Sequence, residues 1–243
     1  GFDWVTYKNE AFGVNVEMLG DAFNEAPLGV SAAAVMNRFR DIEGMSGSAH
    51  GDILRGDNAD ALQIATAGFQ GSILTNIALV SGLQGLLDGM LGAGQTSFGA
   101  GNIMLGGSGS DWIEGRGGDD LIDGDAWLNV RITVTGGPMA GASFNSMTEM
   151  LSLMMDGTIN PGDLAIVREI LNGTDEFDTA VFTGNFAEYQ ITDLGGGVWR
   201  VVDTVIGRDG ADTLRSVERL QFADQVEILV PGLNAEPVGQ PTI

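Results

Sequence analysis

The sequence contains no cysteine, one histidine, and only 11 basic residues against 33 acidic ones. The absence of cysteine excludes disulfides and thiolate metal ligands, and it is compatible with an oxidising exterior. The net charge of −22 repels nucleic acids and anionic membranes, so we expect neither as a partner. We also expect no membrane span, because polar residues interrupt the most apolar stretch, residues 73–91.

Glycine is abundant in this acidic chain, with 38 residues of 243. Hydrophobic residues make up 44%, which argues against an acidic disordered tail. The length allows one elongated unit or two small domains. The sequence starts with Gly1 and has no basic and apolar leader, so we expect a processed piece of a larger protein with an upstream domain.

The strongest motif is a nine-residue pattern, G-G-x-G-x-D-x-U-x, in which U is a large apolar residue. Residues 106–114 fit it fully, and residues 115–123 follow at once with Arg116 in place of the second glycine. Glycines permit tight turns whose carbonyl groups converge on one point. Asp111 and Asp120 add hard anionic oxygens, and calcium takes six to eight such ligands.

The apolar position of each repeat, Ile113 or Ile122, is expected on a short strand that fills the core. Degraded copies recur elsewhere and are centred on Asp52 (residues 47–55), Asn102 (101–105), Gly124 with Asp125, Asp209 with Asp212 (207–215), and more loosely residues 173–178. A single copy is equally well explained as a Gly/Asp-rich surface turn. Two contiguous copies favour a cation site.

Periodicity predicts the remaining elements. The expected strands lie within residues 3–18, from residue 41, at 129–135 and in the last seventy residues; the expected helices cover 31–40, 71–87, 146–155 (opened by a Ser146/Glu149 capping box) and 160–172. The helix at 71–87 is read as a packed cap on the flank, in preference to a membrane-facing helix. Tryptophans and the methionines near 147–155 are read as packing residues.

Nothing in the sequence indicates a catalytic centre. There is no G-x-S-x-G elbow, and the glycines at 106–109 lack the Lys-Ser/Thr of a phosphate-binding loop. A carboxylate pair of the glycosidase type is less economical than a cation for acids clustered in glycine turns. His50 lies inside a repeat turn, where its carbonyl is the group expected to face calcium. We therefore expect no enzyme activity from this segment.

The repeats at 106–123, the copy at 47–54 and the segment 212–224 resemble RTX (haemolysin-type) calcium-binding proteins. Three connecting segments, 75–80, 123–132 and 160–173, look more narrowly like the C-terminal region of bacterial RTX proteins linked to an animal-type haem peroxidase. The resemblance implies a mainly β fold, a right-handed parallel β-roll with helical insertions and a C-terminal α+β capping unit. It places the roll at residues 1–126, with an insertion at about 59–98, and the capping unit, with two helices and terminal strands, at 127–243.

The resemblance also implies calcium ions between turns stacked on the same edge. One would join Asp52 to Asp111, a second Asn102 to Asp120, and a third Asp111 to the turn at Gly124. The full expected ligand set comprises Asp52, Asn102, Gly106, Gly107, Ser108, Gly109, Asp111, Gly115, Gly117, Asp120, Gly124, Asp125, Asp209 and Asp212.

The expected function is that of a secreted, extracellular calcium-binding module from a Gram-negative bacterium. It would fold on meeting several Ca²⁺ ions outside the cell, and its partners would be calcium and the type I secretion machinery. Two alternatives stay open. The segment could contribute to an extracellular haem peroxidase or hydrolase, or it could be a calcium-dependent adhesin module.

Overall fold

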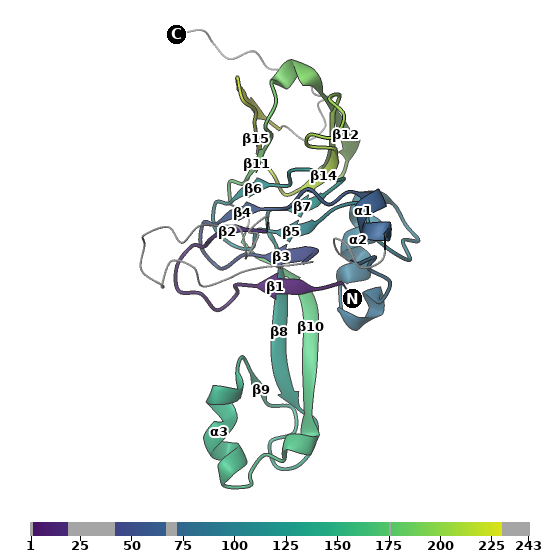
Figure 1. Cartoon of the computed structure of the whole chain (residues 1–243). Helices are drawn as coiled ribbons and strands as arrows, with labels where there is room; N and C mark the ends of the chain where they lie inside the picture. Colours follow the sequence, from purple (N-terminus) through teal and green to yellow (C-terminus); the bar gives the residue numbers. More distant parts are fainter. Residues whose placement is uncertain (1, 19–41, 67–71, 175, 230–243) are drawn as a thin grey trace, which may run out of the picture.

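A computed structural model describes residues 2–18, 42–66, 72–174 and 176–229. The chain is mainly β, as predicted, and has three parts: a body of stacked short strands, a long arm that leaves one side of the body, and a C-terminal unit on top (Figure 1). The helix expected at residues 31–40 lies outside the described residues. None of the helices in the described part has the length and apolar character needed to cross a bilayer.

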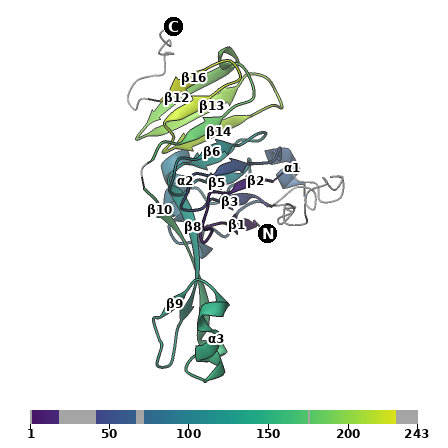
Figure 2. The same cartoon turned by 90° about the vertical axis from the view of Figure 1, so that its left-hand side faces the viewer.

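Two sheets form the body and the C-terminal unit (Figure 2). The seven-stranded sheet contains, in spatial order, β1 (Trp4–Thr6), β3 (Gly44–Ser46), β5 (Ile103–Leu105), β7 (Leu121–Asp123), β14 (Ala211–Arg215), β13 (Val198–Asp203) and β12 (Tyr189–Gly195). The six-stranded sheet contains β16 (Val226–Ile228), β15 (Arg219–Gln221), β11 (Thr179–Val181), β6 (Trp112–Glu114), β4 (Ile53–Arg55) and β2 (Asn15–Glu17). The strands expected within residues 3–18, from residue 41 and near the C-terminus are confirmed.

Successive strands of the body alternate between the two sheets, and each pairs in parallel with the strand one full turn away. Among the described strands of these two sheets, the antiparallel pairs are β12–β13, β13–β14 and β15–β16, all at the C-terminal end. Both sheets continue past residue 127, because β11 pairs with β6 and β14 pairs with β7. Both sheets therefore contain strands from before and after residue 126.

The core lies between the sheets and takes one residue from the middle of each short strand. These inward side chains are Val16, Met45, Leu54, Met104, Ile113, Ile122, Ala180, Leu214 and Leu220. Ile113 and Ile122, the apolar positions of the two strong repeats, are fully buried as predicted. A three-residue strand thus contributes its central side chain inward and its two neighbours outward.

Helix α2 (Leu83–Leu91) covers the outer face of the seven-stranded sheet. Its buried residues pack against Ile103, Leu105 and Leu121, so the flank position expected for this insertion is confirmed. The predicted start at residue 71 is wrong. The segment instead forms a 3₁₀ turn, η2 (Ile77–Leu79), and the helix begins after Gly82, whose φ of +82° is left-handed. A short helix, α1 (Ala61–Ala65), precedes it.

The arm is an antiparallel hairpin of β8 (Ala126–Val134) and β10 (Leu164–Asn172), with β9 (Ser143–Phe144) and α3 (Met147–Met155) at its tip. The helix predicted at 160–172 is wrong. Pro161–Asp163 form only a 3₁₀ turn, η3, and residues 164–172 pair along their whole length with β8. That pairing is non-local and outweighs the helical signals at the two ends of the segment.

The helix predicted at 146–155 is confirmed, but its capping box is not. Ser146 makes no side-chain cap, and Glu149 accepts the Asn145 N–H at 3.0 Å. Of the methionines expected in a core, Met150 is buried while Met147 and Met155 are exposed. Trp112 is also partly exposed, with the Arg219 guanidinium 4.8 Å from its ring centre.

Candidate cation sites at the glycine turns

The candidate site is a set of buried acidic and amide side chains at the turns between the two sheets. Turns that lead from the seven-stranded to the six-stranded sheet form the first edge, and turns that lead back form the second edge. Most of these turns end with a side-chain oxygen at the start of the next strand, whereas the turn before β2 ends with Val14. The first edge carries Asp52, Asp111, Asp178 and Glu218, and the second carries Asn102, Asp120 and Asp212.

Hydrogen bonds join these residues into a ladder along the first edge. The Asp52 N–H donates to Oδ1 of Asp111 at 2.7 Å, and the Asp111 N–H donates to Oδ1 of Asp178 at 2.7 Å. The Asp178 N–H donates in turn to Oε2 of Glu218 at 2.8 Å. Each carboxylate therefore fixes the backbone of the neighbouring turn with one oxygen.

The second edge repeats the arrangement with different residues. The Asn102 N–H donates to Oδ1 of Asp120 at 2.6 Å, and the Asp120 N–H donates to Oδ1 of Asp212 at 2.9 Å. Oδ1 of Asn102 accepts the Asp57 N–H at 3.0 Å. Asn102 thus joins the ladder through its backbone N–H, and its side-chain oxygen bonds within its own connecting segment.

The other carboxylate oxygen of several ladder residues has no hydrogen-bond partner. This holds for Oδ2 of Asp111, Asp120 and Asp178, whose residues are 0%, 1% and 0% exposed. A buried charged oxygen without a partner is costly. These oxygens therefore require a proton or a cation beside them.

Glycines form the space into which these oxygens point. A Cβ built on Gly106 would collide with Oδ2 of Asp111 and with the Gly124 carbonyl oxygen of the next turn. A Cβ on Gly47 would meet the Asp52 carboxylate and the Gly106 carbonyl oxygen in the same way. The missing side chain thus leaves a small cradle, named here by its glycine, between one carboxylate and one main-chain carbonyl.

The second edge has comparable cradles. A Cβ on Gly56 would meet the Gly115 carbonyl oxygen and Oδ1 of Asn102, and a Cβ on Gly115 would meet Oδ2 of Asp120. Hard oxygen donors in glycine-lined cradles are the chemistry that suits calcium.

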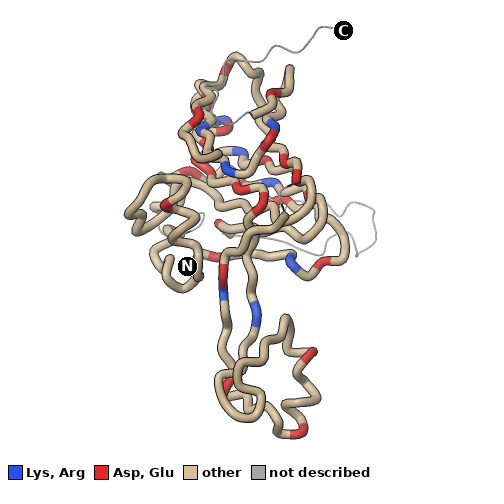
Figure 3. The backbone as a smooth tube through the Cα atoms, turned by 180° about the vertical axis from the view of Figure 1, so that it is seen from behind, with Lys and Arg blue, Asp and Glu red and all other residues tan. Residues whose placement is uncertain are grey.

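Burial shifts the proton affinity of these acids strongly. Desolvation, followed by the charges of Asp178 and Asp52, raises the pKa of Asp111 to about 8. Desolvation and the nearby Glu218 raise the pKa of Asp178 to about 7. Burial also raises the pKa of Asp120 and of Asp212, which lie against one another. Burial therefore favours the protonated form of these acids. Along the chain, acidic residues outnumber basic ones, 33 to 11 (Figure 3).

The structure brings together most of the residues expected to bind metal. The turns of Asp52 and Asp111 are adjacent, as are those of Asn102 and Asp120, and Gly124 lies beside Asp111. Ser108 and Gly109 face another partner: the Ser108 hydroxyl accepts the Thr174 N–H at 3.1 Å, and the Gly109 N–H donates to Glu176 at 2.7 Å.

The flanking glycines of the repeats allow the left-handed backbone angles of the turns. Gly107 and Gly109 have φ values of +107° and +109°, and Arg116 adopts φ +70° where the repeat has a glycine. A Cβ on Gly117 would meet the Arg208 carbonyl oxygen and Asn58 rather than a carboxylate. Asp125 lies at the base of the arm, and its carbonyl oxygen accepts the Gly173 N–H.

Two acids differ from expectation. Asp209 is not on either ladder, because its carboxylate accepts bonds from Thr183 and from the Tyr189 hydroxyl. Asp178 is on the first-edge ladder but was not among the expected ligands. Its signal in the sequence is the loose match at residues 173–178, which the inserted arm separates from the first glycine of the turn.

No group of three or more His, Asp or Glu side chains in a metal-binding arrangement occurs among the described residues. The cradles instead pair one side-chain oxygen with main-chain carbonyl oxygens. A site of this kind depends on backbone donors for much of its coordination.

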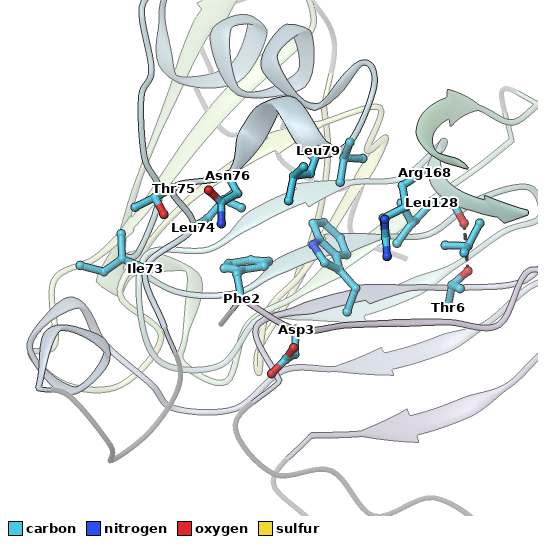
Figure 4. A pocket seen from close by; sticks show the side chains of 13 residues that line it. Phe2, Asp3, Thr6, Ile73, Leu74, Thr75, Asn76, Leu79, Leu128 and Arg168 are labelled. Carbon is cyan, nitrogen blue, oxygen red and sulfur yellow. Dashed lines mark hydrogen bonds between the residues drawn. The ribbon is translucent and has the colours of Figure 1, made fainter. Parts of the chain in front are cut away.

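A separate cavity of about 560 Å³ lies beside β1, between η2 and the base of the arm (Figure 4). Phe2, Trp4 and Leu79 contribute to its apolar wall, and Arg168 stands at one end. No histidine, cysteine, serine or lysine is among the described residues that line it. Asp3, Thr6 and Thr75 are its polar lining residues besides Asn76 and Arg168.

No protein-family model, curated protein or solved structure matches this chain.

Proposed function

We propose that this chain is a non-catalytic calcium-binding module with the architecture of an RTX-type parallel β-roll, and that Ca²⁺ binding at its glycine turns drives its folding. The carrying observation is the repeated cradle, in which an unpartnered, fully buried aspartate oxygen faces a main-chain carbonyl of the adjacent turn. Two strands per full turn and one apolar residue per strand support the β-roll interpretation.

The residues present fit the ion. Calcium accepts six to eight oxygen ligands in irregular geometry, which suits one carboxylate with carbonyls and water. A divalent cation also offsets the repulsion between ladder carboxylates that lack basic neighbours. The chain's own role is to hold the oxygens in place through the ladder hydrogen bonds, such as that from Asp52 to Asp111.

Linkage explains why folding would follow calcium. An ion that binds only the folded state stabilises it by an amount that grows with the logarithm of the free ion concentration. Extracellular calcium modules bind at about 10⁻⁴–10⁻³ M. Such sites stay empty inside a bacterium and fill outside it. This behaviour suits a secreted, extracellular protein exported unfolded by a type I system, which is the localisation we propose from the RTX resemblance.

The test compares the whole chain in excess chelator with the same chain in millimolar CaCl₂. We expect chelation to abolish most of the β signal in circular dichroism and to increase the hydrodynamic radius. Magnesium should not substitute, because it is smaller and demands near-octahedral geometry. An identical spectrum and radius in chelator and in calcium would refute the coupling. A peroxidase assay with a scan for haem absorption tests the enzyme alternative on the same sample.

A further inference from the structure

The arm interrupts one turn of the first edge. The chain leaves the body after Gly124 and Asp125, runs through the hairpin, and returns at Gly173. The Gly173 N–H donates to the Asp125 carbonyl oxygen at 2.6 Å, so the two ends of the arm meet. Residues 124–125, 173–174 and 176–178 thus belong to a single turn that lies between the turn at 106–111 and the one ending at Glu218.

This interrupted turn has the geometry of the continuous ones. Asp178 accepts the Asp111 N–H at 2.7 Å, as Asp111 accepts the Asp52 N–H at 2.7 Å. A Cβ on Gly124 would collide with Oδ2 of Asp178 and with the Ser216 carbonyl oxygen. The same pair of donors, a carboxylate of its own turn and a carbonyl of the next, surrounds Gly106.

A separate observation indicates a ligand at this place. Asp178 is 0% exposed, and its Oδ2 has no hydrogen-bond partner. The residue precedes β11, so packing holds its backbone in place. The oxygen is therefore fixed toward the Gly124 cradle with nothing to offset its burial.

We propose that the interrupted turn binds its own hard divalent cation, of the calcium class, through Oδ2 of Asp178 and the Ser216 carbonyl oxygen, and that this ion clasps the two ends of the arm to the body. The inference deepens the calcium-binding function proposed above and rests on it. It adds a site centred on Asp178, and it makes the base of the arm depend on the ion.

Other contacts hold the arm farther along its length. The Leu128 N–H donates to the Ser46 hydroxyl at 3.0 Å, and the Ile170 N–H donates to the Ser81 carbonyl oxygen at 2.8 Å. These bonds involve β8 and β10 individually. The proposed ion would bind closer to the body than these two bonds, at the point where the ends of β8 and β10 meet. Its loss should therefore loosen the base without unfolding the tip, which has its own core of Val134, Met150 and Ile159.

The test uses Asp178→Asn, which keeps the Oδ1 acceptor for the Asp111 N–H and removes the charge. Glu176→Gln is the matched control, because it removes the same charge from the same loop and Glu176 bonds to Gly109 instead of facing the cradle. Calorimetric titration of the full chain with CaCl₂ gives the number of bound ions. Hydrogen–deuterium exchange in saturating calcium compares residues 124–130 and 168–178 with the tip, residues 143–158.

We expect Asp178→Asn to bind one ion fewer than the wild type and to exchange several-fold faster at the base of the arm, with the tip unchanged. Glu176→Gln should match the wild type in both readouts. A wild-type ion count in Asp178→Asn would overturn the site. One ion fewer with unchanged exchange at the base would overturn the clasp.

Crystals of the wild-type chain grown in CaCl₂ provide a measurement that needs no variant. Anomalous scattering should give a peak beside Oδ2 of Asp178 and Ser216. Peaks beside Asp111 without one at Asp178 would contradict the inference alone, and a wild-type chain that binds no calcium at all would remove the proposed function itself.

Discussion

The two edges of the body join adjacent turns in the same way, although the segments that connect the strands differ in length. On the first edge, the turns at 47–52 and 106–111 are short, and the arm interrupts the next turn while its two ends still meet. On the second edge, only the turn at 115–120 is short, because long segments separate β4 from β5 and β11 from β14. Both edges nevertheless keep a ladder of side-chain oxygens at the strand starts.

The comparison indicates which part of the repeat is essential. Turn length and flanking glycines vary between the edges, whereas an Asp or Glu side chain accepts the backbone N–H in each bond of the two ladders. Its first oxygen is needed to join adjacent turns. The second oxygen has no hydrogen-bond partner in Asp111, Asp120 and Asp178, whereas that of Asp52 accepts the Ser48 N–H.

The largest expected effect comes from filling a first-edge cradle. Gly106→Ala places a methyl group against both the Asp111 carboxylate and the Gly124 carbonyl, two donors of one proposed ion. We expect a loss of about 2–4 kcal/mol in the free energy of unfolding in calcium, the range for strain at a buried site. Urea unfolding in millimolar CaCl₂ measures it.

The control for Gly106→Ala is Gly85→Ala in α2, where a Cβ would have no atom within 4 Å. That change should stabilise the chain by about 0.5–1 kcal/mol, because alanine is the better helix former. Equal effects of the two substitutions would contradict the cradle.

The next largest effect is a loss of calcium affinity, and it should be larger on the first edge than on the second. Asp111→Asn should lower calcium affinity by at least about tenfold, as loss of a metal-site contact commonly does. Asp120→Asn on the second edge should do less, because its neighbour Asn102 already lacks a charge. Calorimetric titration with CaCl₂ measures both, with Glu10→Gln, an exposed acid, as the charge control. A larger effect for Asp120→Asn would reverse the comparison.

The pH dependence of stability should have opposite signs with and without calcium. Burial raises the pKa of Asp111 to about 8 and that of Asp178 to about 7, above the value of about 3.9 in an unfolded chain. In chelator, these acids stabilise the fold when protonated, and that contribution is lost progressively as pH rises from about 4 to about 8. Any residual structure in chelator should therefore be more stable at pH 5 than at pH 8.

In saturating calcium we expect stability to rise with pH instead, because protons compete with the ion for the same oxygens. Calcium affinity should fall as pH drops below about 7. Thermal unfolding at pH 5 and pH 8, with calcium and with chelator, measures all four conditions. The same pH trend in both would show that the buried acids do not bind the ion.

The smallest expected effect is a gain in calcium affinity on the second edge. Asn102 Nδ2 is buried without a partner, and Asn102→Asp would replace it by an anionic oxygen. We expect calcium affinity to rise by roughly threefold to tenfold, because affinity follows the charge count of the ligands. Titration with CaCl₂ checks it, and a weaker affinity would mean that this cradle holds no ion.

Local signals in the sequence predict the continuous turns well. The spacing of glycine, aspartate and isoleucine around Asp111 and Asp120 identifies both the turn and the core residue, because all three lie within nine positions. Helix α3 was also predicted, since its signals are confined to its own length. These elements depend little on distant parts of the chain.

Elements that depend on distant partners were predicted less well. Residues 164–172 have a helical start and stop, yet they pair with β8, whose residues lie 30 to 46 positions earlier. Asp178 lies on the ladder only because the arm returns its chain to Gly124, and no pattern within residues 173–178 records that return. Asp209 carries the motif of a ligand, but Thr183 and Tyr189 occupy its oxygens.

The three-residue strands of the body have a consequence for the segments that connect them. Each strand supplies one inward side chain, and the column of these side chains is complete whatever connects one strand to the next. Long segments such as the arm therefore leave the body between two strands and return to it without a break in the column of inward side chains. The body thus keeps one continuous core, while the segments that connect its strands differ in length and carry different surfaces.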